Sequence, residues 1–333
     1  MKLKPWVKFT LTIIILVSIF TFCPKAYDIF KELSITAAKS TKKGIDKVIE
    51  KVSSKQDTTE YEECLKSPFS KEILSAQTQE FTTSLDNYLQ NLGGVSLKYE
   101  DLTSGFEYHF KSSETVYAAS TIKLLDALYL YKQADEGNID LNETITYTSS
   151  YIYSSSKGMQ NHQLNENISL KTLVKYAVIY SDNSAHQMLI DYIGFNNLKA
   201  FGNNLGATTT LVGGDNFGNL SANDGILYLK ELYNFFQKNN DLSNELKQYF
   251  LEAEENAIKY PELTSEVAHK YGYYQAYFND LAIVYDPYPY ALAVTTLHGQ
   301  SDYIKIVNDI SRQINELHQK YITDKKNYCQ NKT

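Results

Sequence analysis

The chain of 333 residues is long enough for one large domain or two modest ones, and its 43% hydrophobic and 21% charged residues are ordinary for a globular protein. The net charge is −7, and because residues 1–25 carry four lysines and no acidic residue, the rest of the chain carries −11. An acidic body without a basic run offers no electrostatic surface to nucleic acid, so the composition argues against a nucleic-acid partner.

The N-terminus combines a short basic segment with an apolar run. Lysines flank the uncharged stretch FTLTIIILVSIFTFCP at 9–24, which is intermediate in length between a signal-peptide core and a full membrane span. No small-residue cleavage site follows it, so we predict an uncleaved signal anchor over residues 1–25. Cleavage, which would give a secreted protein, is the alternative. The lysines predict a cytoplasmic N-terminus, and hence a single-pass cell-membrane protein whose remaining chain is extracytoplasmic.

Residues 26–67 are polar, charged and poor in aromatic residues, and they are predicted to form an extracytoplasmic stalk. Periodic elements begin near residue 68, so residues 68–323 are predicted to form one domain, followed by a polar tail at 324–333. Cys64 and Cys329 lie just outside the first and last predicted helices of this domain, where a disulfide would join its ends. Two free thiols are the alternative, and the sequence does not decide between them.

The periodic elements alternate between helical and extended patterns. In chain order we expect a helix at 71–92, strands at 95–101 and 106–112, a helix from Ser120 to near Gly137, helices at 170–181, 184–193 and 222–238, strands at 267–278, 280–286 and 290–298, and a helix at 301–321. Strands at both ends with helices between them predict an α+β fold. Its antiparallel sheet would be flanked by the N- and C-terminal helices, with an inserted all-α lobe, and the cleft between sheet and lobe is the default site.

The pattern S-x-x-K occurs three times, beginning at Ser40, Ser120 and Ser154. Ser40 lies in the predicted stalk and Ser154 in a polar loop, and neither setting offers a pocket. Ser120 opens a helix, where its own N–H has no helical partner and could bind a developing oxyanion. Lys123 follows at i+3 on the same helical face, so its amine could reach the Ser120 hydroxyl.

Two further triplets follow in the helical and strand regions. Ser181-Asp182-Asn183 falls between two helical patterns, and Lys270-Tyr271-Gly272 falls on a predicted strand. In this order, S-x-x-K, S-D-N and K-x-G resemble the class A β-lactamases and the related penicillin-binding D,D-peptidases. The resemblance covers roughly residues 70–320 and includes segments such as IYSDNSAHQMLIDYIG and SANDGILYLKELY. It implies a serine hydrolase that forms an acyl-enzyme.

The resemblance also implies roles for the residues that react. Ser120 would attack a carbonyl carbon, and Lys123 would take its proton. Ser181 would pass a proton to the leaving nitrogen, held by Lys270, whose charge would also attract a substrate carboxylate.

Other residues of the same motifs would bind the substrate. Asn183 would bind its amide, while Asp182 is expected to be structural. The N–H groups of Ser120 and Tyr273 would form the oxyanion hole, and Gly272 would let the substrate backbone approach the strand.

The chain departs from the family pattern at two places. Class A β-lactamases carry a glutamate after S-D-N that activates the deacylating water, but here no glutamate occurs between Glu166 and Glu231. Asp215 is the one acid well placed in the 207–224 segment, and after two glycines it is expected to form a turn. Tyr271 stands where the family usually has Thr or Ser, so its ring could fill part of the carboxylate site.

These features predict an acyl-enzyme with a β-lactam or a peptidoglycan-stem-like peptide ending in D-Ala-D-Ala that forms readily and is released slowly. The implied biology is the cell wall and the response to antibiotics. Two alternatives stay open: a non-catalytic sensor of β-lactams or cell-wall fragments, and an esterase or amidase of the same fold. No cofactor is implied. No metal is implied either, because the six histidines show no paired ligand spacing, and His269 is expected to pack beneath the cleft.

Overall fold

The computed structural model describes residues 59–153, 156–298 and 302–332. The predicted anchor, most of the predicted stalk, Ser40 and Ser154 lie outside these residues. The contacts divide the chain into two compact units, one at Ser67–Tyr328 and another formed by Met1–Lys66 with Cys329–Thr333. None of the helices in the described residues is long and apolar enough to cross a membrane.

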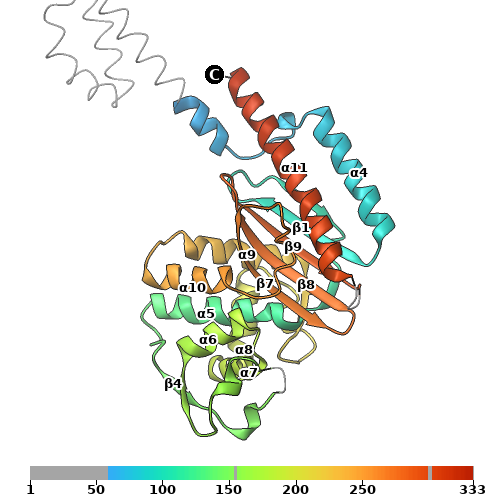
Figure 1. Cartoon of the computed structure of the whole chain (residues 1–333). Helices are drawn as coiled ribbons and strands as arrows, with labels where there is room; N and C mark the ends of the chain where they lie inside the picture. Colours follow the sequence, from blue (N-terminus) through green and yellow to red (C-terminus); the bar gives the residue numbers. More distant parts are fainter. Residues whose placement is uncertain (1–58, 154–155, 299–301, 333) are drawn as a thin grey trace, which may run out of the picture. The chain divides into compact units, whose positions relative to one another are not determined.

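The larger unit alternates helices and strands as Figure 1 shows. A helix at 59–66 precedes it. The elements that follow are η1 (Lys71–Ile73), α4 (Ala76–Leu92), β1 (Val95–Asp101), β2 (Glu107–Phe110), β3 (Thr115–Tyr117), η2 (Ala119–Ile122), α5 (Lys123–Asp135), β4 (Thr144–Thr146), η3 (Ser149–Tyr151), η4 (Met159–Asn161), β5 (Asn167–Ser169), α6 (Leu170–Ile179), α7 (Asn183–Ile193), α8 (Phe195–Asn204), β6 (Asn219–Ser221), α9 (Ala222–Phe236), α10 (Asp241–Leu251), β7 (Glu266–Tyr274), β8 (Tyr277–Tyr285), β9 (Tyr290–Thr296) and α11 (Tyr303–Lys332).

The main sheet is antiparallel and is built from both ends of the domain. Its strand order is β2-β1-β9-β8-β7, so β1 pairs with β9 and the central strand joins the two halves of the chain. β7 is an edge strand, and η2 lies against it. Two short ribbons, β3 with β6 and β4 with β5, complete the pairing among the described residues.

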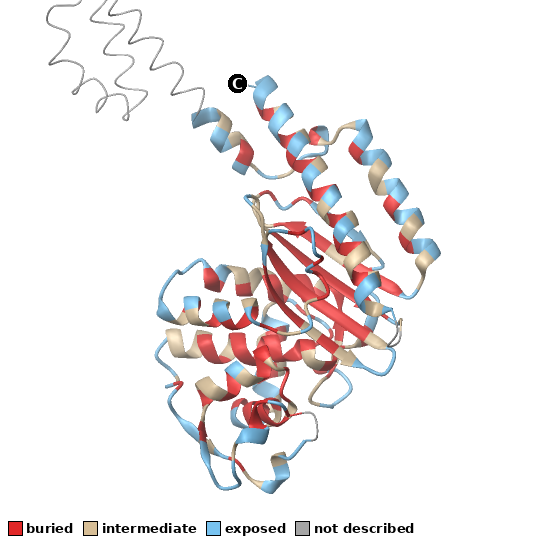
Figure 2. Ribbon diagram, viewed as in Figure 1, coloured by how far each residue is buried: buried red, intermediate tan, exposed pale blue. Residues whose placement is uncertain are grey.

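The sheet separates two hydrophobic cores, because successive side chains of a strand point to opposite faces. In β8, Leu281 and Ile283 pack with the helical lobe, while Ala282 and Val284 pack with α4 and α11. Both faces of the central strands are therefore buried, as Figure 2 shows. The predicted α+β fold, with a sheet flanked by the terminal helices and an inserted helical lobe, is confirmed.

Polar caps fix where several lobe helices begin. The side chains of Ser169, Asp182 and Ser221 accept hydrogen bonds from backbone N–H groups in the first turns of α6, α7 and α9. These bonds satisfy donors that have no partner within the helix. The cap at Asp182 also sets the direction of the chain at Ser181, which precedes α7.

Several boundaries differ from the sequence predictions. The helix expected from residue 71 begins at Ala76, after η1, and the α-helix expected from Ser120 begins at Lys123, after η2. β7 ends at Tyr274 and β8 begins at Tyr277, because Gln275 turns the chain with a left-handed φ of 54°. The tyrosines on both sides of this turn continue the strand pattern and conceal it in the sequence. The last helix continues through the predicted polar tail to Lys332.

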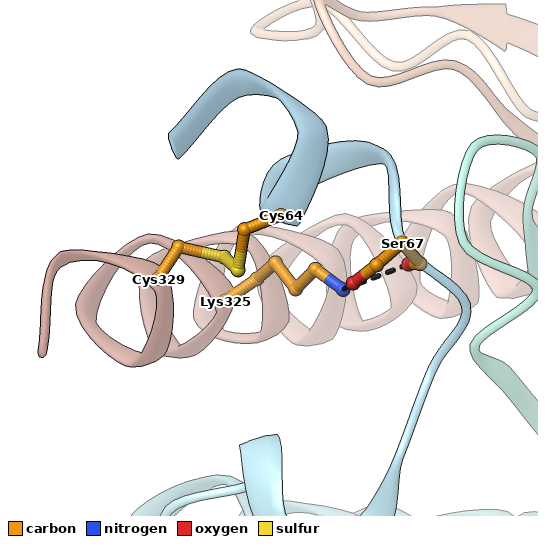
Figure 3. The surroundings of a disulfide bond; sticks show 4 residues. All are labelled: Cys64, Ser67, Lys325 and Cys329. Atoms are coloured by element: carbon orange, nitrogen blue, oxygen red, sulfur yellow. Dashed lines mark hydrogen bonds between the residues drawn. A yellow bond between two sulfur atoms is a disulfide. The ribbon is translucent and has the colours of Figure 1, made fainter. Parts of the chain in front are cut away.

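The disulfide that the sequence left open is present in the smaller unit. Cys64 and Cys329 are joined, with their Cα atoms 5.7 Å apart, as Figure 3 shows. Four residues before Cys329, the Lys325 ammonium donates hydrogen bonds to the carbonyl and hydroxyl oxygens of Ser67, at 2.8 and 2.9 Å. The start of the larger unit is thus bound to its own last helix.

Candidate active site

Ser120 lies in the short 3₁₀ helix η2, which leads directly into α5. The preceding residue, Ala119, has a left-handed φ of 51°. Non-glycine residues rarely adopt this conformation, which costs energy and is concentrated at functional sites. The turn holds the Ser120 side chain partly exposed, although its neighbours Ala119 and Thr121 are buried.

Lys123 is fully buried and has three oxygen atoms close to its amine, with Ser181 Oγ farther away at 3.5 Å. Its ammonium donates to Ser120 Oγ at 2.8 Å, to the Ser181 carbonyl at 2.5 Å and to Asn183 Oδ1 at 2.6 Å. Burial, and next the positive charge of Lys270, hold the pKa of Lys123 well below its usual range, against the opposing charges of Asp126 and Asp182. The neutral form of this amine is therefore easier to reach than that of an exposed lysine.

The three oxygens suit both charge states of the amine. A charged ammonium has three N–H donors for them. A neutral amine has two, which the carbonyl of Ser181 and Oδ1 of Asn183 can accept, while its lone pair accepts the Ser120 hydroxyl proton. A proton can thus pass from Ser120 to Lys123 without any movement of the surrounding groups.

Ser181 lies between the two lysines that the sequence singled out. Its hydroxyl accepts a hydrogen bond from Lys270 at 3.0 Å, and Lys123 Nζ is 3.5 Å away. Ser181 has a left-handed φ of 56°, which turns the chain between α6 and α7. Burial lowers the pKa of Lys270 to about 7, although Asp280 acts in the opposite direction. Both protonation states of Lys270 are therefore populated near neutral pH.

Asp182 is a structural residue in this site. Besides capping α7 through Ala185 N at 2.9 Å, its carboxylate accepts from the N–H groups of Gly158 and Met159, at 2.8 and 2.9 Å. It therefore fixes the loop that packs against α7. The structural role expected for the central residue of S-D-N agrees with these contacts.

Gly272 allows the edge strand β7 to lie directly against η2. A Cβ atom at this position would be 2.6 Å from the Ala118 carbonyl oxygen and 2.8 Å from the backbone nitrogen of Ser120. Real Cβ atoms do not approach other atoms so closely, so only glycine fits. This contact places the N-terminal end of η2 against β7 at Gly272, the residue before Tyr273.

Tyr271 lies beside the charged end of Lys270. The ammonium is 4.4 Å from the centre of the Tyr271 ring, within the range of a cation–π contact. Burial raises the pKa of Tyr271 to about 12, although a hydrogen bond with Ser181 lowers it. The ring therefore stands next to the group expected to attract a substrate carboxylate.

The loop at 211–218 contains no carboxylate that contacts Lys123. Asp215 accepts from the N–H groups of Phe217 and Gly218, at 2.7 and 3.0 Å, and so forms the expected turn. Phe217 instead lies 5.7 Å from Lys123 Nζ, measured to the ring centre. Glu166 is exposed elsewhere in the lobe and pairs with His162 at 2.8 Å.

The structure thus brings together Ser120, Lys123, Ser181, Asn183 and Lys270, and it places Gly272 against Ser120. Sequence reasoning missed Phe217. The signal for it was weak: a single aromatic residue in a glycine-rich loop where a glutamate was sought. Within the described residues, no group of three His, Cys, Asp or Glu side chains is arranged to hold a metal ion.

Comparisons with known proteins identify the family and the fold. Residues 79–318 match the model of the beta-lactamase enzyme family, Beta-lactamase2. Comparison with curated protein sequences gives no significant match.

Similar solved structures include an ancestral class A β-lactamase, with 20% identity and a TM-score of 0.62 over 71% of this chain and 99% of that one. A penicillin G acyl-enzyme of PBP-A carrying a leucine-to-glutamate mutation has 19% identity and a TM-score of 0.65 over 73% and 97%. A β-lactamase from Xanthomonas campestris has 18% identity and a TM-score of 0.61 over 72% and 97%. These identities establish the fold, while the family model covers most of the chain. The protein therefore belongs to the beta-lactamase enzyme family.

Proposed function

We propose that the protein is a serine hydrolase that forms an acyl-enzyme on Ser120 with β-lactams or D-Ala-D-Ala-type peptides and releases the acyl group slowly. The observation that carries this proposal is the buried Lys123 amine, with its lowered pKa, 2.8 Å from Ser120 Oγ. A nucleophilic serine needs a neighbouring base, and this contact places an amine with a lowered pKa beside the hydroxyl.

Acylation can be written from these contacts. Ser120 Oγ attacks the carbonyl carbon, and its proton passes to Lys123. The N–H groups of Ser120 and Tyr273 stabilise the oxyanion, next to the positive end of the helix. When the C–N bond breaks, the leaving nitrogen takes the Ser181 proton, which Lys270 replaces across their 3.0 Å hydrogen bond.

Slow release follows from the 211–218 loop. Hydrolysis of the ester requires a base that activates water, and the loop directs the ring of Phe217 toward Lys123 while Asp215 is engaged in its turn. Lys123 is then the nearest base, and an apolar ring lies beside it.

Tyr271 is expected to affect which substrates the site accepts. Its ring stands beside Lys270, where a substrate carboxylate would bind. We therefore expect penicillins, whose carboxylate must share this space with the ring, to react with lower apparent affinity than their acylation chemistry alone would give.

The cellular location belongs to the same proposal. The basic and apolar residues of 1–25 support a signal anchor that holds the catalytic domain outside the cytoplasmic membrane. A domain so placed would meet both cell-wall peptides and external antibiotics.

A time course of intact mass after addition of one equivalent of penicillin G tests the proposal. The protein should gain the mass of the antibiotic and keep it over many minutes, and Ser120→Ala should gain nothing. Ser40→Ala, which alters another S-x-x-K copy, is the matched control and should behave as the unaltered protein.

Other outcomes discriminate among the alternatives. Rapid return to the unmodified mass would contradict slow release. Equal labelling of the unaltered protein and Ser120→Ala would exclude Ser120 as the nucleophile. Tight binding of penicillin without any covalent adduct would favour the sensor function instead.

A further inference from the structure

Asp126 and His186 form a buried pair next to the candidate active site. Asp126 lies one helical turn after Lys123 in α5, and His186 lies one turn after Asn183 in α7. Both residues are fully buried, and His186 Nδ1 is 2.5 Å from Asp126 Oδ2. The other carboxylate oxygen of Asp126 has no hydrogen-bond partner in the described part of the chain. The hydrogen bond with His186 is therefore the one that Asp126 makes through its carboxylate among the described residues.

The other ring nitrogen of His186 contacts a loop. Nε2 lies 3.1 Å from the backbone carbonyl oxygen of Asn216, which can only accept a hydrogen bond. Nε2 must therefore carry a proton, whether Nδ1 donates to an ionised Asp126 or accepts from a protonated one. In both arrangements Asp126 occupies Nδ1 and leaves Nε2 to donate to the loop.

The loop residue held in this way comes directly before Phe217. The side chain of Asn216 also donates to Gln187 Oε1 at 2.7 Å, so adjacent residues of α7 hold its main chain and its side chain. The His186 ring is 4.8 Å from the Phe217 ring, centre to centre. Phe217 in turn lies beside Lys123.

We propose that the Asp126–His186 pair positions the 211–218 loop, and so keeps Phe217 beside Lys123 where it limits the access of water to the acylated Ser120. Neither residue touches the reacting atoms, so both are positioning residues. The inference rests on the proposed function, since it concerns the lifetime of the same acyl-enzyme.

None of the charged groups around Lys123 in the described residues takes the place of the Phe217 ring in limiting the access of water. Lys270 lies across the site, Asp126 and Asp182 lie on α5 and at the start of α7, and Asp215 is engaged in its turn. When Phe217 moves away, water can reach the ester. Lys123 first passes the proton that it gained during acylation through the Ser181 hydroxyl to Lys270, which gave one up in that step. The water oxygen then attacks the acyl carbon while Lys123 takes a proton from the water, and this proton returns to Ser120 Oγ as the ester C–O bond breaks.

The first test compares acyl-enzyme lifetimes after reaction with penicillin G. His186→Leu removes the contact with Asn216, Phe217→Ala removes the ring, and each should shorten the lifetime by about tenfold while acylation persists, a change equal to about 1.4 kcal/mol in the barrier. Because His186 acts through Phe217, the double variant should shorten the lifetime no further. Asp126→Asn, which can donate to Nδ1 and leave the proton on Nε2, should retain most of the lifetime.

His162→Leu is the matched control. It breaks another His–carboxylate pair of the same lobe, with Glu166, and should leave the lifetime unchanged. An unchanged lifetime in His186→Leu, or fully additive effects in the double variant, would overturn the proposal. If His186→Leu does not fold, as judged by circular dichroism, Asp126→Asn with His186→Phe takes its place, since it refills the volume of the ring and leaves no buried charge.

Hydrogen–deuterium exchange tests the positioning without penicillin. Peptides covering 211–218 should exchange about tenfold faster in the His186 variant, whereas α10 peptides should not change. Unchanged exchange in the loop would refute the positioning role of the Asp126–His186 pair even if acylation occurs. If the protein is never acylated, but the loop of the His186 variant loses protection as expected, the proposed function is refuted. The positioning role of the Asp126–His186 pair is then still supported.

Discussion

At the scale of single residues, the site depends on two lysines that burial makes easier to deprotonate. Lys123 and Lys270 are both fully buried, and both contact Ser181. They differ in what lies around them. Lys123 meets oxygen atoms that suit either charge state, whereas Lys270 meets the Ser181 hydroxyl, the Tyr271 carbonyl oxygen and the Tyr271 ring. The first arrangement suits a base, and the second suits a positive charge offered to a substrate.

The pKa of Lys270 gives a prediction for pH dependence. Its pKa is lowered to about 7, so Lys270 loses its charge as the pH rises through that value. The second-order rate constant for acylation by penicillin G should therefore fall above about pH 7. This constant is the one to measure, because it reports the pKa values of the free protein.

Two comparisons check whether Lys270 causes this fall in the acylation rate constant at alkaline pH. Lys270→Arg stays charged at every accessible pH, so its rate constant for acylation should no longer fall above pH 7, whatever its absolute value. A penicillin methyl ester has no carboxylate to attract, so its rate should fall less steeply. If the rate constant of Lys270→Arg falls above pH 7 as in the unaltered protein, a group other than Lys270 causes the fall.

At the scale of elements, the site depends on the close packing of β7 against η2. Gly272→Ala would bring a Cβ within 2.8 Å of three backbone atoms, of Ala118, Ser120 and Thr121. Backbone atoms cannot rotate away as side chains can, so one element must shift. We expect a loss of about 1–3 kcal/mol in the free energy of unfolding. We also expect a fall of about a hundredfold in acylation, a size typical for loss of one oxyanion-hole donor.

Gly105→Ala separates the two effects. Gly105 has a φ of 74° in the turn between β1 and β2, and nothing lies within 4 Å of its Cβ position. Alanine there should cost about 1 kcal/mol of stability through its φ alone. Acylation by penicillin should stay at the level of the unaltered protein. If Gly272→Ala acylates equally well, the strand does not form part of the oxyanion hole.

The elements predicted well from sequence are those whose pattern is repeated over many residues. The strands β1, β8 and β9 and the helices α4, α6 and α9 show clear alternation or helical periodicity, and they lie close to their expected positions. The end of β7 was misplaced because tyrosines continue across the turn. Short ribbons such as β3 with β6 carry too few residues for a pattern and depend on the surrounding packing.

The residues of the site likewise divide into those that could be predicted from the sequence and those that could not. Ser120, Lys123, Ser181 and Lys270 could be proposed because local motifs mark them and because the ordered triplets resemble a known family. Phe217, Asp126 and His186 could not, because their significance arises from contacts between elements. Asp126 and His186 are sixty residues apart, and their side chains meet only when α5 packs on α7.

At the scale of the whole molecule, the disulfide between Cys64 and Cys329 spans 265 residues of sequence. A cross-link of this length restricts the unfolded chain, and typical native disulfides contribute about 2–4 kcal/mol. The double variant Cys64→Ser/Cys329→Ser should lose stability of this order in urea unfolding. Its acylation by penicillin at low denaturant should be unchanged, because neither cysteine is one of the site residues.

Cys23→Ser is the control for this prediction. Cys23 is the remaining cysteine, and it lies in the N-terminal apolar run. Equal unfolding midpoints for the double variant and the unaltered protein under oxidising conditions would contradict the stabilising role of the bond.

The same bond turns the chain between Cys64 and Cys329 into a closed covalent ring. A protease that cuts one exposed loop, such as 211–218, opens this ring but releases no fragment, and both pieces migrate together until a reductant is added. Only the residues before Cys64 connect the ring to the N-terminal segment. One cut among residues 26–63, the predicted stalk, would therefore separate the whole ring from the N-terminal segment, whereas one cut inside the ring would leave every part of the ring attached.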